Sequence, residues 1–405
     1  MNHLFLFDVD SVLVEAVGYL TALQDAIAHF SRRMGLGDHH PTERDVRTFE
    51  ALGLGCEWDT SSICVAALLV ERVRREPAMP LPAEWEQALA YLAERPCPLP
   101  PLDYVELAER IVARLDGQKA VAAAARAVLW DEVRSLPDLG PATAKAVDAL
   151  LKTLLGDTYD FYHTPVTRYF QHLVLGSQTI SEVYGVTPEI ESVSYLARDD
   201  EPLLAPDARE RLAAAVSARR VRVAIYTARP SLLPAEVDGS ALGYSPEGEI
   251  ARTLVGLDGH PLIGKGQMQW LALQAGVPVE QLVKPSPVQG LAAIGAARSR
   301  SEAPALRAAL SLYRDAVLRP PLADAGPLAV HTFEDTTGGL EAVQRAVELL
   351  QTAGVTANFY PYGVVPPGGA KAAAMARGGF PAFGSVNDAL DAALELVGVP
   401  LSGLH

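Results

Sequence analysis

Short runs of apolar residues stand at the start of the chain and recur in its second half. The run HLFLF at 3–7 stops at Asp8, and such a run is typical of a strand buried on both faces of a parallel sheet. Similar runs predict further strands at 221–226, 279–283, 327–333 and 356–364. Helical periodicity at 207–219 and 339–352 lies between these runs, and strands that alternate with helices predict a doubly wound parallel sheet.

Residues 16 to about 200 show a different pattern. Apolar positions there recur every 3.6 residues, which predicts helices and almost no strand. Proline-rich breaks separate the helices, which we expect at 16–34, 62–75, 83–94, 103–116, 119–135, 141–155 and 164–184. A long helical insertion therefore interrupts an α/β domain after its first strand. We expect a Rossmann-like α/β core of residues 1–13 and 201–405, and a large inserted α-helical cap domain of residues 14–200.

The composition is that of a globular protein and limits its partners. Of the 405 residues, 49% are hydrophobic and 20% are charged, which excludes general disorder. The formal net charge is −15, so the chain lacks the basic footprint that binding to nucleic acid or to an anionic membrane surface requires. All apolar runs are shorter than the ~18 residues of a membrane span, so we expect no transmembrane helix.

The cysteines and the N-terminal segment predict a soluble, cytoplasmic protein. Cys56, Cys64 and Cys97 are an odd, sparse set without a CxxC pair, which is not a disulfide framework. Asp8 and Asp10 lie inside the first apolar stretch and no basic region precedes them, unlike in a signal peptide. A small molecule is the expected partner, and the sequence leaves the oligomeric state open.

Polar residues follow several of the expected strands and predict a site for a divalent cation and a phosphate. Ligands of an open parallel sheet bind beyond the carboxyl ends of the strands, so these residues should gather at one edge. They are Asp8 and Asp10, Thr227, Lys284, and Glu334 with Asp335. Carboxylate oxygens suit Mg²⁺, a carboxylate can attack phosphorus, and lysine neutralises charge on a transferring phosphoryl group.

Four segments that contain these residues resemble the four motifs of the haloacid dehalogenase superfamily. FDVDSVLVE at 7–15 resembles the first motif, and IYTARP at 225–230 is similar to the second. VKPSP at 283–287 resembles the third motif, and FEDTTGGLEAV at 333–343 resembles the fourth. The segments stand in the family's order, and the helical insertion lies where this superfamily places a helical cap. The likeness points to its phosphatase or phosphoglucomutase-like branch.

The resemblance covers residues 1–13 and about 205–390, and it implies catalytic roles. Asp8 would be the nucleophile that attacks phosphorus. Asp10 would protonate the leaving oxygen and then deprotonate the hydrolytic water. Lys284 would hold Asp8 and the phosphate together.

The resemblance also implies two sets of binding residues. Those for the substrate phosphate are Ser11, Thr227, Ala228, Arg229 and Lys284. Those for Mg²⁺ are Asp8, Asp10 through its backbone carbonyl, Asp335, and Glu334 directly or through water. Ser11 and Val12 depart from the family, which usually has glycine and threonine at these two positions.

These observations together predict Mg²⁺-dependent hydrolysis of a small phosphorylated metabolite, a phosphomonoester, through an aspartyl-phosphate on Asp8. Two alternatives stay open. One is a phosphomutase that moves a phosphoryl group between hydroxyls of one sugar phosphate. The other is a non-catalytic binding protein that keeps the fold. Dehalogenase chemistry is disfavoured, because those members of the superfamily lack an aspartate at the position of Asp10.

Overall fold

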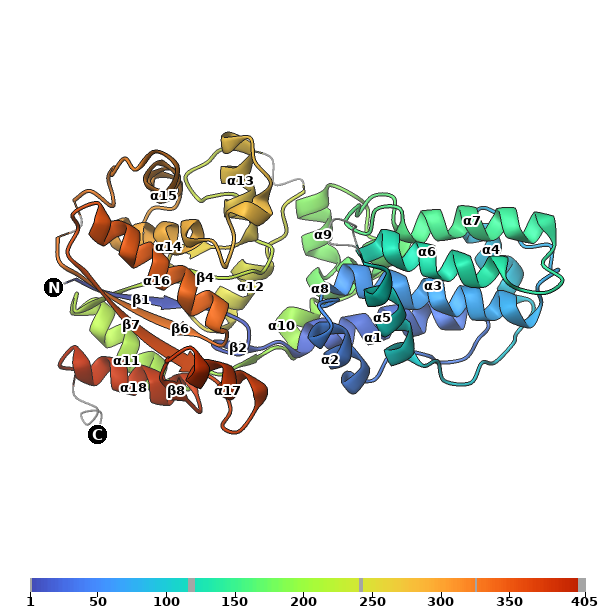
Figure 1. Ribbon diagram of the computed structural model, residues 1–405, viewed down its shortest axis with the longest axis horizontal. Coiled ribbons are helices and arrows are strands. Elements are labelled where there is room, and N and C mark those ends of the chain that lie inside the picture. Colours follow the sequence, from blue (N-terminus) through green and yellow to red (C-terminus); the bar gives the residue numbers. More distant parts are fainter. Residues whose placement is uncertain (1, 116–120, 240–242, 325, 400–405) are drawn as a thin grey trace. The chain divides into compact units, whose positions relative to one another are not determined.

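The structure is a computed structural model that describes residues 2–115, 121–239, 243–324 and 326–399 (Figure 1). Its internal contacts divide the chain into two compact units. The first unit comprises Met1–Ala16, Glu182–Gly185 and Asp200–His405, and the second comprises Val17–Ser181 and Val186–Asp199. Apart from Glu182–Gly185, the chain therefore leaves the first unit soon after its first strand and returns at Asp200.

A six-stranded parallel sheet with the order β5-β4-β1-β6-β7-β8 forms the centre of the first unit. Its strands are β1 (Asn2–Phe7), β4 (Val221–Tyr226), β5 (Leu262–Ile263), β6 (Leu328–Glu334), β7 (Ala357–Val364) and β8 (Ala382–Phe383). β1 is central and pairs in parallel with β4 on one side and β6 on the other. The expected α/β class, a Rossmann-like parallel sheet with an inserted helical region, is confirmed.

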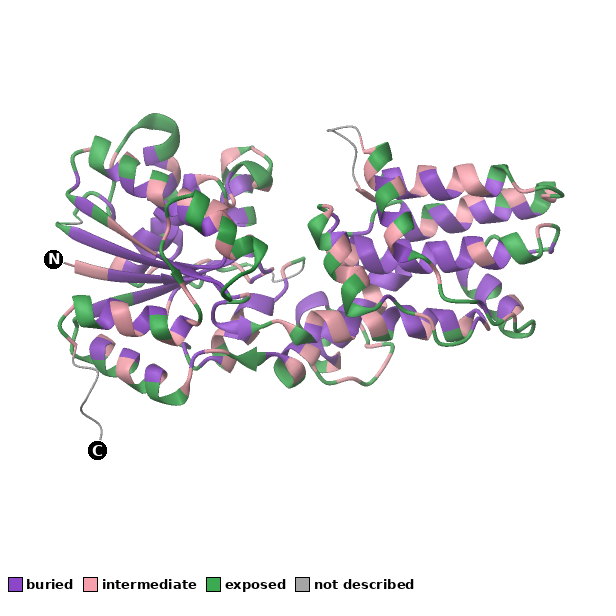
Figure 2. Ribbon diagram, turned by 60° about the horizontal axis from the view of Figure 1, so that its bottom comes forward, coloured by how far each residue is buried: buried purple, intermediate pink, exposed green. Residues whose placement is uncertain are grey.

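Helices cover both faces of the sheet. Successive side chains of a strand point to opposite faces, and those of β1 are apolar on both, so each face needs a covering layer. Leu4 and Leu6 of β1 enter one core and Phe5 and Phe7 enter the other. The first core is closed by α13 (Lys265–Ala275), α14 (Pro287–Ser299), α15 (Ala303–Asp315) and α16 (Thr337–Thr352). The second is closed by α11 (Pro206–Ser217), α12 (Glu247–Leu254) and α18 (Val386–Leu396). Figure 2 shows the strands buried between these two layers.

The strand expected at 279–283 is wrong. Val279–Gln281 form the short 3-10 helix η1, and the edge strand next to β4 is β5 instead. β5 has only two residues, too few to produce a recognisable apolar run in the sequence. Lys284 therefore follows a helical turn rather than a strand, and reaches the sheet edge from the loop before α14.

Two short strands form a ribbon where the chain leaves and re-enters the first unit. β2 (Val14–Glu15) pairs antiparallel with β3 (Glu201–Pro202), with Glu15 opposite Glu201. The Leu203 amide extends the ribbon by donating to the carbonyl of Leu13 at 2.8 Å. The two crossings are therefore held side by side by backbone hydrogen bonds.

Every described element between residues 17 and 199 is a helix. These helices are α1 (Val17–Arg33), α2 (Glu43–Ala51), α3 (Glu57–Arg75), α4 (Trp85–Ala93), α5 (Tyr104–Arg114), α6 (Val121–Arg134), α7 (Pro141–Leu155), α8 (Pro165–Leu175), α9 (Ser177–Tyr184) and α10 (Tyr195–Asp199). α3 packs against α1, α6, α7 and α8 and is buried along most of its length. None of the described helices has the length and hydropathy of a membrane-spanning segment.

The single helix expected at 164–184 is divided into α8 and α9 at Gly176. The φ of this glycine is +79°, a left-handed conformation that side chains disfavour. A Cβ atom at this position would also lie 2.6 Å from the backbone nitrogen of Ser194. Gly176 therefore permits both the turn and the close approach of the segment that leads into α10.

Candidate active site at the carboxyl edge of the sheet

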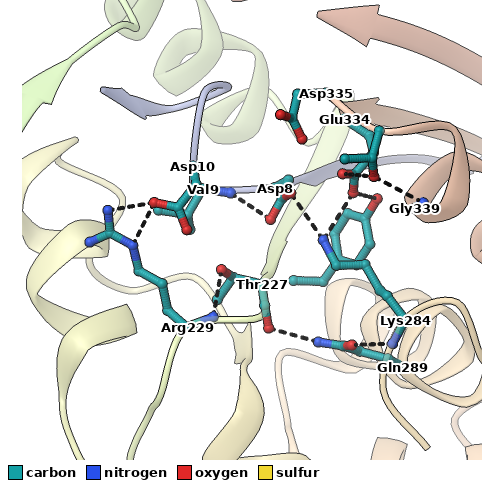
Figure 3. A network of polar contacts seen from close by, with 12 residues as sticks. Asp8, Val9, Asp10, Thr227, Arg229, Lys284, Gln289, Glu334, Asp335 and Gly339 are labelled. Carbon is teal, nitrogen blue, oxygen red and sulfur yellow. Dashed lines mark hydrogen bonds and ion pairs between the residues drawn. The ribbon is translucent and has the colours of Figure 1, made fainter. Parts of the chain in front are cut away.

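The carboxyl ends of β1, β4 and β6 bring together most of the residues expected from the sequence (Figure 3). Phe7 of β1 lies opposite Ile225 of β4 and Phe333 of β6. The residues that follow them, Asp8, Tyr226 and Glu334, therefore reach the same level at one edge of the sheet.

The residues Asp8, Tyr226, Lys284, Glu334 and Asp335 form what we call the inner cluster. Lys284 Nζ lies 3.0 Å from Asp8 Oδ2 and 3.0 Å from Glu334 Oε2. The Tyr226 hydroxyl donates to Glu334 Oε2 at 2.7 Å, and its ring centroid lies 4.6 Å from the ammonium. All three carboxylates are buried, so the lysine lies between negative groups that water hardly reaches.

Burial and neighbouring charges set the protonation of the inner cluster. Burial raises the pKa of Asp8 well above its ordinary value, and the adjacent Glu334 carboxylate raises it further. Burial also acts to raise the pKa of Glu334, but the Lys284 ammonium and the hydrogen bonds to its carboxylate outweigh burial and lower it. Burial raises the pKa of Asp335. The inner cluster thus holds more acidic groups than its one ammonium neutralises.

Glu334 lies against the N-terminus of α16, where the helix dipole stabilises a negative charge. The Thr336 hydroxyl donates to Glu334 Oε1 at 2.8 Å and accepts from the Gly339 amide at 3.2 Å. A Cβ atom on Gly339 would lie 2.1 Å from Glu334 Cδ, so only glycine leaves room for this carboxylate. The glycine of the fourth motif therefore has a steric role beside the acidic pair.

The inner cluster has the donor set of a Mg²⁺ site. Asp8, Glu334 and Asp335 each offer one carboxylate oxygen, and these three oxygens lie within 4.8 Å of one another. All are hard ligands, as Mg²⁺ prefers, and a divalent cation would balance the excess negative charge. The Asp10 carboxylate lies outside this group; its expected contribution was through the backbone carbonyl. Lys371 of α17 (Ala370–Arg377) pairs with Asp335 Oδ2 in this structure.

Asp10, Arg229 and Asp200 form a second group, which we call the outer cluster. Arg229 Nε and Nη2 lie 2.9 and 2.6 Å from Asp10 Oδ1. Arg229 Nη2 also lies 3.0 Å from Asp200 Oδ2. Arg229 was expected to contact the substrate phosphate, and here its guanidinium binds the second aspartate of the first motif. Sequence reasoning missed Asp200, which lies almost 200 positions from Asp10 and in no motif.

Thr227 directly follows β4 and is held in place by two neighbours. Its hydroxyl accepts a hydrogen bond from the Arg229 amide at 3.1 Å. Gln289 Nε2 donates to the carbonyls of Thr227 and Ile263, each at 2.9 Å, and Gln289 Oε1 accepts from the Lys284 amide at 3.1 Å. Gln289 therefore ties the second motif to the third. Gln289 is the one polar side chain in the stretch 287–297 of α14, and this is the signal that could have revealed it.

Ser11 and Ala228 are both exposed, at positions that flank the sheet edge. Ser11 adopts φ +61°, the left-handed conformation that favours the glycine usual in the first motif. The turn still closes, because the amides of residues 12, 13 and 14 all donate to the carbonyl of Val9. Serine thus replaces glycine here without loss of the turn.

Two more residues of the site were not expected from the sequence. Tyr226 ends a strand that is apolar apart from the exposed Arg222, and its hydroxyl gave no signal of a polar contact. Lys371 follows a glycine-rich segment, and its position beside Asp335 depends on how α17 packs after β7. Both side chains contact the acidic groups of the site, Tyr226 at Glu334 and Lys371 at Asp335.

No protein-family model matches the chain, and no curated protein matches it. A target of the Northeast Structural Genomics Consortium, solved by X-ray, has 15% identity and a TM-score of 0.61, with 98% of this chain and 100% of that chain covered. Phosphatase Tt82 from Thermococcus thioreducens has 13% identity and a TM-score of 0.43, with coverage of 97% and 99%. A 2-haloacid dehalogenase from Pseudomonas syringae pv. Tomato DC3000 has 14% identity and a TM-score of 0.28, with coverage of 91% and 89%. The similarity to the first structure shows a shared fold. The TM-scores of the other two structures are too low to support a conclusion about this chain.

Proposed function

We propose that the protein is a phosphatase of the haloacid dehalogenase type, which hydrolyses a small phosphorylated metabolite through an aspartyl-phosphate on Asp8. One observation carries the proposal. Asp8 is buried at the end of the central strand, with the Lys284 ammonium at 3.0 Å and two further carboxylates beside it. The four motif-like segments supply these same residues in the order that the superfamily uses.

In the first step, an oxygen of Asp8 attacks phosphorus and the bond from phosphorus to the ester oxygen breaks. Asp10, in its acid form, gives its proton to that oxygen, which leaves as an alcohol. In the second step, a water oxygen attacks phosphorus and Asp10 takes a proton from the water. The bond from phosphorus to Asp8 then breaks, which releases inorganic phosphate and restores the Asp8 carboxylate.

The cations of the inner cluster act on charge that develops during these steps. Lys284 lies beside Asp8 and neutralises charge on the transferring phosphoryl group. Mg²⁺, held by Asp8 and Asp335 with Glu334 beside them, would supply further positive charge to the phosphoryl oxygens. The Lys371 side chain is 55% exposed, so it can leave Asp335 at little cost when a cation binds.

Asp10 supports phosphoryl transfer over dehalogenation, since removal of a halide needs no acid to protonate the leaving group. Its side chain is 41% exposed, far more than the neighbouring carboxylates, so it can meet a substrate and a water molecule. Asp8 and Asp10 thereby fit two different tasks, covalent attack and proton transfer.

The proposal is tested by incubating the purified protein with Mg²⁺ and a panel of phosphorylated metabolites that includes hexose phosphates. We expect free phosphate, and an acid-quenched sample should carry a phosphate on the peptide that contains Asp8. In ¹⁸O-labelled water the label should enter phosphate and not the Asp8 carboxylate. An isomeric sugar phosphate without phosphate release would indicate the mutase, and no turnover of any compound would favour the binding protein.

A further inference from the structure

The outer cluster joins three segments that are distant in the sequence. Asp10 lies in the turn after β1, Asp200 immediately precedes β3, and Arg229 lies in the loop after β4. The guanidinium contacts both carboxylates, with Nη2 lying 2.6 Å from Asp10 Oδ1 and 3.0 Å from Asp200 Oδ2. One cation therefore links the turn of the first motif to the segment that returns to the first unit.

The three side chains differ in their access to water. The side chains of Arg229 and Asp200 are 2% and 0% exposed, whereas that of Asp10 is 41% exposed. A buried guanidinium needs a countercharge, and Asp200 supplies one that water cannot reach. Asp200 therefore holds Arg229 in place, and Asp10 is the member of the outer cluster that a substrate can approach.

The backbone of Arg229 is fixed independently of its side chain. Its amide donates to the Thr227 hydroxyl at 3.1 Å, and its carbonyl accepts from the Lys265 amide, at the start of α13, at 2.9 Å. Asp200 is fixed in turn because the next two residues, those of β3, pair with β2. The guanidinium thus has a defined place before it contacts Asp10.

We propose that Asp200 and Arg229 are positioning residues that hold the Asp10 carboxylate for proton transfer. Both hydrogen bonds from Arg229 reach Oδ1, so Oδ2 is the oxygen that meets the ester oxygen and later the water. The proposal rests on the proposed function, which gives Asp10 its acid–base role. It differs from the expectation that Arg229 binds the substrate phosphate.

A positioning role predicts that the damage depends on the leaving group. An alkyl phosphate has a poor leaving group and needs the proton that Asp10 supplies. The dinitrophenolate of 2,4-dinitrophenyl phosphate is a good leaving group and departs without that proton. General acid catalysis contributes about 10²- to 10⁴-fold to a rate, so partial loss of its alignment should be visible with the first ester.

The test compares kcat/KM of Asp200→Asn and Arg229→Lys for these two esters, with Asp10→Asn as the reference. This ratio reports formation of the aspartyl-phosphate, the step in which Asp10 acts on the leaving group, and not the later hydrolysis that both esters share. We expect Asp200→Asn to lower kcat/KM for the alkyl ester by about 10- to 100-fold, and for the aryl ester by less than about 3-fold. Asp207→Asn is the matched control, because that aspartate is 70% exposed and pairs with Arg211 on α11. It should leave both rates unchanged.

Equal losses of kcat/KM on both esters, the result expected of a phosphate ligand, would overturn the proposal. If Asp200→Asn does not fold, Arg229→Lys applies the same test from the other side of the ion pair. A crystal structure of the Asp200→Asn variant should show Asp10 displaced from Arg229, and an unmoved Asp10 contradicts the proposal. A wild type that cleaves neither ester contradicts the proposed function instead.

Discussion

The inner and outer clusters place the same types of residue in different surroundings. In the inner cluster, three buried carboxylates surround one ammonium, which lies 3.0 Å from two of them. In the outer cluster, one guanidinium bridges a fully buried carboxylate and a half-exposed one. Asp8 and Asp10 are two positions apart, yet each belongs to a different cluster. The surrounding cation and the access of water, rather than residue type, therefore give these two carboxylates environments that suit different roles.

The two cations are matched to these surroundings. Lys284 is a compact charge that can sit between two carboxylate oxygens, whereas the planar fork of Arg229 donates from two nitrogens to Asp10 and from one of them to Asp200. An exchange of lysine and arginine at either position is therefore not conservative.

Asp8→Asn and Asp10→Asn test whether the two clusters carry different chemistry. Asp8→Asn should lower kcat by roughly 10⁴-fold or more for every ester, because an amide is a poor nucleophile at phosphorus. Asp10→Asn should lower kcat/KM by about 10²- to 10⁴-fold for alkyl esters and by much less for activated aryl esters. Steady-state kinetics on both ester types measures this, with circular dichroism as the check on folding. Identical profiles for the two variants would erase the distinction.

Lys284→Ala should have the largest effect on stability, because it leaves the inner carboxylates without their ammonium. Breaking a buried ion pair costs about 3–5 kcal/mol, and urea unfolding at pH 7 should show a loss of that size. Lys371→Ala is the matched control, since that lysine pairs with Asp335 but is 55% exposed, and it should cost less than about 1 kcal/mol. Comparable losses for the two variants would mean that burial does not distinguish them.

Mg²⁺ should stabilise the wild type, and the carboxylates that bind it should be those of the inner cluster. At a concentration one hundred times its Kd, a ligand of the folded state adds about 2.7 kcal/mol to the free energy of unfolding. Thermal unfolding with and without Mg²⁺ should show this gain in the wild type and in Asp200→Asn, but not in Asp335→Asn. A gain that survives Asp335→Asn, or disappears with Asp200→Asn, would assign the cation to other residues.

Glu249 differs from the carboxylates of both clusters, because its close partner is a backbone amide and not a cation. Its Oε1 accepts from the Leu232 amide at 3.1 Å, and burial raises its pKa to about 7. The folded state therefore holds the proton more tightly than the unfolded state, whose pKa is near 4.5. This contribution to stability is complete below pH 4.5 and is lost as the pH rises through about 7.

The effect of Glu249 on the free energy of unfolding should be smaller than those of Lys284→Ala and of Mg²⁺. We expect about 1–2 kcal/mol after allowance for partial exposure. Glu249→Gln stays uncharged at every pH, so the variant should be more stable than the wild type at pH 8 and similar to it at pH 4.5. Denaturant unfolding across this range measures the difference. A constant difference at all pH values would show that Glu249 does not titrate in this window.

The sequence predicted those parts of the fold that depend on long apolar runs. β1, β4 and β6 are runs of six or seven residues, and the polar residues that follow them mark the edge where the site lies. β5 could not be recognised because two residues carry no period. Lys284 was assigned to a strand end for the same reason, since a short apolar segment fits a strand and a helical turn equally well.

The contacts around the acidic groups could not be predicted, because they join positions far apart in the chain. Asp200 meets Arg229 only after the chain has completed the helical insertion. The hydroxyl of Tyr226 reaches Glu334 across the neighbouring strand β1. The need for glycine at position 339 depends on where Glu334 points, which the spacing of the fourth motif does not state.

The pairing of β2 with β3 brings the two ends of the helical insertion close together. Glu15 and Glu201 lie opposite each other, so their Cα atoms are separated by about 5 Å, the usual span across an antiparallel pair. A two-residue turn such as Asn-Gly closes a gap of that size. The whole segment between them thus occupies the place of a hairpin loop, where a protein engineer can remove or exchange it.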